Sequence, residues 1–346
     1  MGLYQLFENT YKIISIVGMA KNAGKTVTLN ALIESLDQNG ASVGLTSIGR
    51  DGERQDIVTK TDKPMIYVKK GTLIATAELL FGLSEVKMAV VEVTDHQTAM
   101  GRVIIGRTLA DGYVQIGGPS SNSAVNAVAE RMLGHGADYV LVDGALDRAS
   151  SASPLITEAC VLATGAVLSR DMTKAISKTV HKASLFNLPE ASEASVLEYW
   201  GLAEESRQVI SIDSENQARA LGTSKTALSA GRNIGEWVDE QTKILLFPGA
   251  LTTKTLMEIV HGTQHYKSIQ FVVADATKLF IEHKDWQYFK RIGVDIRVRY
   301  GIKLLAITVN PYAPQGYFYD GALFKQSLNE RLPEIPIVDV MEGDGL

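Results

Sequence analysis

The stretch from Lys12 to Leu36 constrains the fold of this chain more than any other segment. It reads KIISIVG, then MAKNAGKT, then VTLNALIESL. The first part is a short apolar run typical of a buried strand, and the last part has the helical spacing of an amphipathic helix. A strand, a loop of small residues and a helix in direct succession predict an α/β protein whose loop binds an anion at the start of the helix.

The loop ends in Gly24, Lys25 and Thr26, which close the phosphate-binding pattern of glycine, four residues, then Gly-Lys-[Ser/Thr]. The opening glycine is displaced, because the pattern requires it at Met19 and it stands at Gly18. Lys25 is the residue type that reaches β- and γ-phosphates, and a Thr26 hydroxyl suits Mg²⁺. The opening glycine mainly serves the turn, so its displacement does less harm than loss of Lys25.

We therefore predict that the loop binds a nucleoside triphosphate. The guanine signal Asn-Lys-x-Asp is absent from the sequence, which favours ATP over GTP. The predicted cofactors are ATP and Mg²⁺, and the predicted contact residues are Gly18, Lys21, Asn22, Ala23, Gly24, Lys25, Thr26 and Val27.

Lys21 is a second cation within the loop. In some dimeric P-loop ATPases an extra loop lysine reaches the partner subunit's nucleotide, but Lys21 stands one residue closer to Gly-Lys-Thr than their usual pattern. Two interpretations stay open: a solvated loop lysine, or a residue that acts across a homo-oligomer.

A P-loop enzyme also needs an acid at the end of a neighbouring strand to hold Mg²⁺. Asp143 follows the apolar run YVLV and precedes glycine, so we predict that it holds the metal together with Thr26. Asp51, in GLTSIGRDGE, is a candidate to orient the attacking water or the metal, although Asp-Gly is also a common turn pair. The predicted catalytic residues are Lys25, Asp51 and Asp143.

Other polar residues compete with these assignments. Glu92, Asp95 and His96 follow a third strand-like run and form an alternative source of a metal-binding carboxylate or a base. Asp147 and Arg148 are interpreted as an ion pair or as a coupling element. Asn310, after another apolar run, is either a contact to the nucleotide base or the first residue of a turn.

Strand-like runs alternate with helical patterns along most of the chain, which predicts a mostly parallel sheet with flanking helices of the P-loop NTPase kind. The polar, alanine-rich stretch 188–241 interrupts this alternation. We therefore predict a nucleotide-binding domain at 1–187, a connecting or helical region at 188–241 and a second α/β unit at 242–346. The predicted strands are Ile13–Val17, Val43–Ser47, Met88–Val93, Tyr113–Ile116, Tyr139–Val142, Cys160–Ala163, Ile244–Phe247, Ile269–Val273, Lys303–Val309 and Ile335–Val340.

Composition narrows the class of protein. A formal net charge of -5 argues against nucleic acid or an anionic membrane as the main partner. Cys160 is the one cysteine, and no signal peptide or membrane-length apolar run is visible, so we expect a cytoplasmic protein. The motifs H-E-x-x-H, G-x-G-x-x-G and C-x-x-C do not occur.

The segments SIVGMAKNAGKTVTLNALI, GLTSIGRDGE, VLVDGALDR and VLATGAVLSRD follow one another in this order. Over residues 12–175 the chain resembles the P-loop ATPase-like subunit of the reactivase for cobalamin-dependent lysine aminomutase. It is also similar to the broader class of P-loop proteins that contains dethiobiotin synthetase and the maturation GTPases.

The resemblance implies an ATP-hydrolysing chaperone that opens the mutase so that damaged cobalamin leaves. Its implied partners are the aminomutase and a second reactivase subunit. Two alternatives stay open: an ATP-dependent ligase or kinase of the dethiobiotin synthetase kind, and a regulatory module that binds nucleotide without hydrolysing it.

Overall fold

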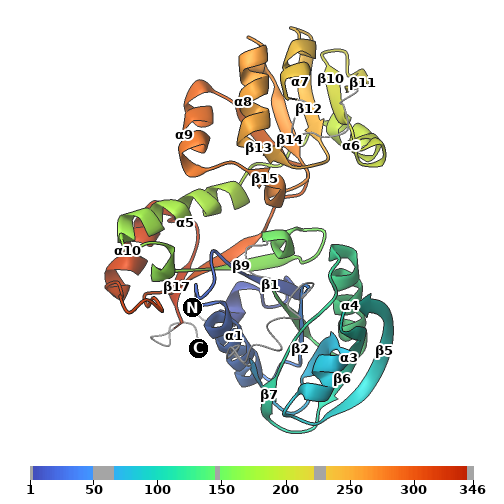
Figure 1. Cartoon of the computed structure of the whole chain (residues 1–346), viewed down its shortest axis with the longest axis vertical. Helices are drawn as coiled ribbons and strands as arrows, with labels where there is room; N and C mark the ends of the chain where they lie inside the picture. The colour runs from blue at the N-terminus through green and yellow to red at the C-terminus, as the bar shows by residue number, and fades with distance from the viewer. Residues whose placement is uncertain (1–2, 50–65, 145–148, 222–230, 341–346) are drawn as a thin grey trace. The chain divides into compact units, whose positions relative to one another are not determined.

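The computed structural model describes residues 3–49, 66–144, 149–221 and 231–340 (Figure 1). The chain divides into two compact units. Unit 1 comprises Met1–Val180 and Lys303–Leu346, and unit 2 comprises His181–Ile302. Unit 1 is thus built from two segments that are far apart in the sequence.

A nine-stranded sheet forms the centre of unit 1, in the order β18-β17-β9-β1-β8-β2-β4-β6-β5. Neighbouring strands are parallel from β18 to β4, and β6 and β5 add an antiparallel edge. The predicted α/β fold with a mostly parallel sheet is confirmed. The strands are β1 (Ile13–Gly18), β2 (Val43–Ser47), β4 (Leu73–Ala77), β5 (Met88–Thr98), β6 (Gly101–Thr108), β8 (Tyr139–Asp143), β9 (Ala159–Gly165), β17 (Leu304–Asn310) and β18 (Ile337–Asp339), with the separate pair β3 (Ile66–Val68) and β7 (Gly112–Val114).

Helices cover both faces of this sheet. The apolar stripe of α1 (Lys25–Gln38) packs with β1, β2 and β8 in one core. The apolar stripe of α4 (Asn122–Gly134) packs on the other face of the sheet in a second core. Each large aliphatic side chain buried in this way contributes roughly 1.5–3 kcal/mol. The remaining helices of unit 1 are α3 (Glu78–Leu83), α10 (Gly321–Arg331) and the first part of α5 (Met172–Phe186).

Unit 2 has its own five-stranded sheet in the order β11-β10-β12-β14-β16. Helix α6 (Ala194–Ser206) packs Trp200 and its apolar neighbours on one face of that sheet. The strands are β10 (Val209–Asp213), β11 (Ala218–Leu221), β12 (Thr242–Phe247), β14 (Gln270–Val273) and β16 (Asp295–Val298), with the short pair β13 (Leu251–Thr252) and β15 (Leu279–Phe280); the other helices are α7 (Gly231–Trp237), α8 (Thr253–Gly262) and α9 (His283–Ile292).

These units differ from the predicted division at 187 and 241. The segment 188–241 is not a connection, because the apolar run VISI forms β10 and pairs with β12, with Ile210 opposite Leu246. The end of the chain does not belong to unit 2, because β17 pairs with β9 and extends the sheet of unit 1. A buried apolar strand fits either sheet, so the sequence does not reveal this return.

Every predicted strand corresponds to an observed one, with shifts at the ends. The strands that the sequence reading missed are β3, β4, β6, β10, β11, β13, β15 and β16. Among the described residues, no helix combines the length and apolar character needed to cross a membrane.

Candidate functional site

The carboxyl ends of four neighbouring parallel strands meet around the loop between β1 and α1. Ile16 of β1 lies opposite Asp143 of β8, and Gly18 lies opposite Ala163 of β9. On the far side of β9, Asn310 of β17 lies opposite Gly165. In open α/β sheets this edge is where ligands bind, so the fold places the predicted site at the expected position.

Two residues of the loop have unusual backbone conformations. Asn22 and Gly24 both have left-handed backbone conformations, with φ of 64° and 104°. Gly24 is the N-cap of α1 and provides no side-chain cap, and the first intrahelical bond runs from the Thr28 N–H to the Gly24 oxygen over 2.9 Å. The N–H groups of Lys25, Thr26 and Val27 precede this bond. They form the free first turn that binds phosphate in P-loop proteins.

Lys25 is held over the end of β8. Its Nζ donates to the Gly144 carbonyl oxygen and lies 3.7 Å from Asp143 Oδ1, and its side chain is 13% exposed. The displaced Gly18 has a clear role here, because a Cβ at that position would lie 2.6 Å from Lys25 Cγ. The glycine therefore lets the lysine side chain cross the end of β1.

We predict that Gly18→Ala lowers MgATP affinity about tenfold, because a methyl group displaces the Lys25 stem and overpacking of this kind costs about 1–3 kcal/mol. The measurement is isothermal titration calorimetry with MgATP, together with the melting temperature. Gly134→Ala, in open space at the end of α4, is the matched control and should leave affinity unchanged. Equal affinities for the G18A variant and the unmodified chain would contradict this explanation of Gly18.

Asp143 is the last residue of β8 and is 33% exposed. Its neighbours fix the backbone: the Gly144 N–H donates to the Ile16 oxygen over 3.0 Å, and the Ile48 N–H donates to the Asp143 oxygen over 3.2 Å. No side chain fits at position 144, because a Cβ there would lie 2.7 Å from the Ile16 oxygen. The structure therefore brings Asp143 and Lys25 together at the end of β8.

The competing acids lie elsewhere. Glu92 and Asp95 are on β5, which β2, β4 and β6 separate from β8. Both accept bonds from Arg131 at 2.8 Å, and Glu92 also contacts His135 at 2.7 Å. The hydrogen bond to His135, with Arg131, lowers the pKa of Glu92, and the pKa of Asp95 is lowered by its own backbone N–H and by Arg131. These acids thus belong to an ion-pair cluster, and His96 lies beside them on β5, 3.9 Å from Asp95.

Two residues of β17 touch the loop and the helix that follows it. Asn310 Nδ2 donates to the Asn22 oxygen over 3.4 Å, and the Asn310 Oδ1 accepts from the Tyr312 N–H over 3.1 Å. One turn further into α1, the hydroxyls of Thr28 and Thr308 lie 2.6 Å apart in a fully buried contact. The sequence suggested a base contact or a turn for Asn310, and it gave no signal for Thr308.

The other predicted site residues differ in their exposure, and some of them lie outside the described residues. Lys21 and Asn22 are exposed and Ala23 is buried, while Thr26 and Val27 are partly buried at the start of α1. Asp51, Asp147 and Arg148 lie outside the described residues, so their predicted roles stay predictions. The part of the chain that the structure describes holds no cluster of three or more His, Cys, Asp or Glu residues arranged as a metal site.

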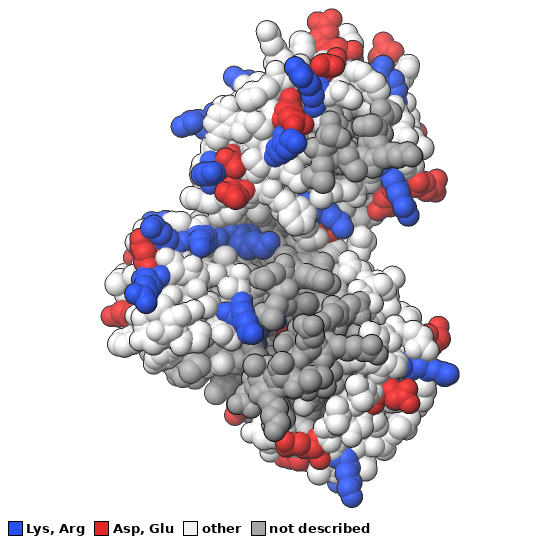
Figure 2. Space-filling view, in the orientation of Figure 1, with Lys and Arg blue, Asp and Glu red and all other residues white. Residues whose placement is uncertain are grey.

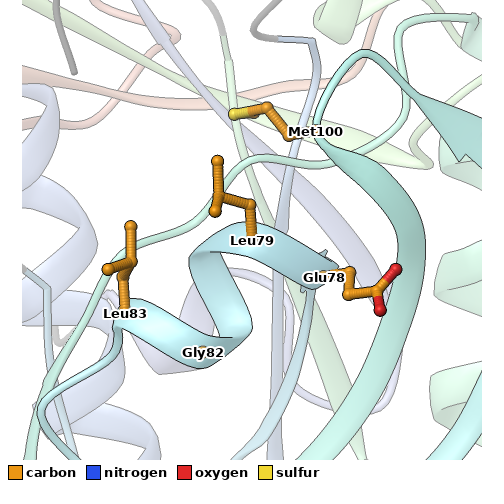
Figure 3. Close-up of a pocket in the computed structure, with 5 residues that line it drawn as sticks. All are labelled: Glu78, Leu79, Gly82, Leu83 and Met100. Atoms are coloured by element: carbon orange, nitrogen blue, oxygen red, sulfur yellow. The ribbon is translucent and has the colours of Figure 1, made fainter. Parts of the chain in front are cut away.

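A separate hollow of about 530 Å³ lies between α3 and the turn that joins β5 to β6 (Figure 3). Leu79, Leu83 and Met100 point to one side of it, and Glu78 points away from them. The sheet order separates these elements from β1, so this apolar hollow is not part of the phosphate-binding loop.

Basic side chains form a row over α5 (Figure 2). Lys174 and Lys178 are exposed, and they have local partners: Lys174 Nζ lies 4.0 Å from Asp171, and Lys178 Nζ donates to the Leu168 oxygen. Asp171 also accepts from the Thr173 N–H over 2.9 Å and thus caps the first turn of α5. The row is a solvated helix face.

The loop with left-handed Asn22 and Gly24, the partly buried Lys25 and the acid at the end of a neighbouring strand form a phosphate-binding-loop architecture in an α/β fold. No protein-family model and no curated protein matches the chain. Among solved structures it is similar to that of pNOB8 ParA bound to nonspecific DNA, at 13% identity and a TM-score of 0.28. The likeness covers 53% of this chain and 64% of ParA, so the chain spans less than two thirds of that protein. At that TM-score, it carries no argument about activity or partners.

Proposed function

We propose that the chain binds a nucleoside triphosphate with Mg²⁺ at residues 18–27 and hydrolyses it. The observation that carries the proposal is the position of Lys25, which crosses the bare Gly18 backbone and reaches the end of β8 beside Asp143. Gly24 supports the same assignment, because its φ of 104° keeps side chains out of the cradle. Lys25 thus supplies a donor for a triphosphate, and Gly18 and Gly24 leave room for it.

The roles follow from charge and position. Lys25 and the first-turn N–H groups of α1 would hold the β- and γ-phosphates, and Thr26 and Asp143 would hold Mg²⁺. Bound Mg²⁺ supplies charge neutralisation at the phosphates. Lys25 donates to the Gly144 oxygen, and on binding it would exchange this carbonyl partner for phosphate oxygens, which are stronger acceptors for an ammonium group.

The finer part of the proposal is that hydrolysis drives a chaperone reaction on an adenosylcobalamin-dependent aminomutase, with a second reactivase subunit. It is supported by the sequence resemblance over residues 12–175. The loops at the carboxyl ends of the strands are the elements through which a change in the bound nucleotide would reach a partner, since nucleotide-dependent ordering of such loops is a common switch.

One assay tests both parts. Purified protein is incubated with MgATP or MgGTP, and phosphate release is followed alone, with inactivated aminomutase, or with candidate small acids and amines. Stimulation by the aminomutase supports the chaperone function. Hydrolysis that requires a small acid or amine instead favours a ligase or kinase, tight binding without turnover favours a regulatory module, and absence of nucleotide binding contradicts the whole proposal.

A further inference from the structure

We infer that Asn310 and Thr308, at the end of β17, are positioning residues for the phosphate-binding loop, and that they act on the triphosphate group rather than on the base. This inference rests on the proposed function. It assigns part of the nucleotide site to β17, a strand that follows the whole of unit 2 in the sequence and pairs with β9 in the sheet of unit 1.

The first step concerns Asn310 and the loop backbone. Its Nδ2 donates to the oxygen of Asn22, a residue whose φ of 64° places it in the left-handed region. Its Cβ packs so close to Gly24 that a Cβ there would lie 3.0 Å away. Asn310 therefore contacts both residues with positive φ in the loop, and these residues set the direction of the N–H groups that face phosphate.

The second step concerns what fixes Asn310 itself. Its Oδ1 accepts from the Tyr312 N–H over 3.1 Å, so both ends of the amide are engaged. Its backbone is fixed by pairing with Gly165, where a Cβ would lie 2.5 Å from the Asn310 oxygen. The amide therefore has a protein partner at each end, and the partner of its Nδ2 lies in the phosphate-binding loop.

The third step concerns Thr308. Its hydroxyl and that of Thr28 are 2.6 Å apart, and both residues are at most 1% exposed. A buried hydroxyl pair of this kind is costly to break, since each partner then loses its bond away from water. The pair fixes α1 relative to β17 one turn after Lys25, so β17 holds the loop through Asn310 and the helix through Thr308.

The test compares ligands with and without a base. Affinities for MgATP, MgGTP and magnesium tripolyphosphate are measured by calorimetry for the full chain and for the variants N310A, T308V and T308S. We expect N310A and T308V each to lose about fivefold in affinity, by the same factor for all three ligands, in line with the loss of one hydrogen bond. T308S keeps the hydroxyl and should retain affinity, which separates the hydroxyl contact from general packing.

The matched control is Asn39→Ala, at the opposite end of α1, where Asn39 Nδ2 donates to the Ser35 oxygen over 2.7 Å. It should lower the melting temperature but leave all three affinities unchanged. Loss of MgATP and MgGTP affinity with tripolyphosphate unaffected would overturn the inference in favour of a base contact, and unchanged affinities in N310A and T308V would also overturn it. If the unmodified chain binds none of the three ligands, the proposed function fails and the inference fails with it.

Discussion

Lys25→Ala is expected to lower the affinity for MgATP by at least about 100-fold. In the proposed site the Lys25 ammonium group would bond the β- and γ-phosphates, and charge-assisted bonds of this kind are worth about 1.5–3 kcal/mol each. The side chain is 13% exposed, so water screens it less than a surface lysine. The measurement is calorimetric titration with MgATP, supported by a thermal shift with saturating nucleotide.

The control for this prediction is Lys12→Ala. Lys12 is exposed and stands just before β1, at the end of the strand opposite the loop, so its removal changes the net charge equally without touching the site. The K12A variant should bind MgATP within about twofold of the unmodified chain, since exposed charges contribute little. An unchanged MgATP affinity in the K25A variant would remove the basis for the proposed nucleotide site.

The local structure around the loop was easier to predict from the sequence than the division of the chain into units, and the reason is physical. A phosphate-binding loop is local, so Gly24, Lys25 and Thr26 follow one strand and start one helix within a dozen residues. Asp143 was predictable because a buried apolar strand ends in an acid. Each of these signals is present in a short window of the chain.

The contacts that the sequence did not reveal are those between distant segments. Thr28 and Thr308 are 280 positions apart, and a threonine in an apolar strand looks the same whether its hydroxyl is paired or not. The return of β17 to unit 1 depends on which sheet has an open edge, and that is set by the whole fold. Gly18 shows an intermediate case, because its displacement was visible but its packing on Lys25 was not.

On the antiparallel edge, β5 was predicted as Met88–Val93, and β6 was missed for another reason. The sequence reading recognised continuous apolar runs, which are typical of parallel strands buried on both faces. Arg102 and Arg107 lie within β6 and interrupt its apolar pattern, and β6 pairs with an edge strand whose side chains are largely exposed. Strands at such an edge carry a weaker signal, and only pairing with β4 and β5 identifies β6.

Asp143→Asn is expected to lower the rate of ATP hydrolysis about 100-fold or more and to weaken the Mg²⁺ dependence of ATP binding. The amide keeps the size of the side chain at the end of β8 and removes the negative charge that a hard cation prefers. In EDTA, the D143N variant should bind ATP at least as tightly as the unmodified chain, because a carboxylate no longer faces the phosphates. The measurement is ATP affinity over a range of Mg²⁺ concentrations, with phosphate release recorded in parallel.

Glu92→Gln provides the matched control, since it makes the same chemical change on β5. Glu92 is bound by Arg131 and His135, so its charge serves a local cluster and has no part in the loop. The E92Q variant should therefore keep the hydrolysis rate and the Mg²⁺ dependence of the unmodified chain. If D143N retained its Mg²⁺ dependence, Asp143 would not be the metal-binding acid, and the carboxylate would have to come from another segment, with Asp51 as the next residue to test. D143N leaves the hydrogen bond from Lys25 to the Gly144 oxygen in place but removes the ion pair of 3.7 Å between Lys25 and Asp143, so the Mg²⁺ dependence, and not the ATP affinity alone, reports on metal binding by the carboxylate.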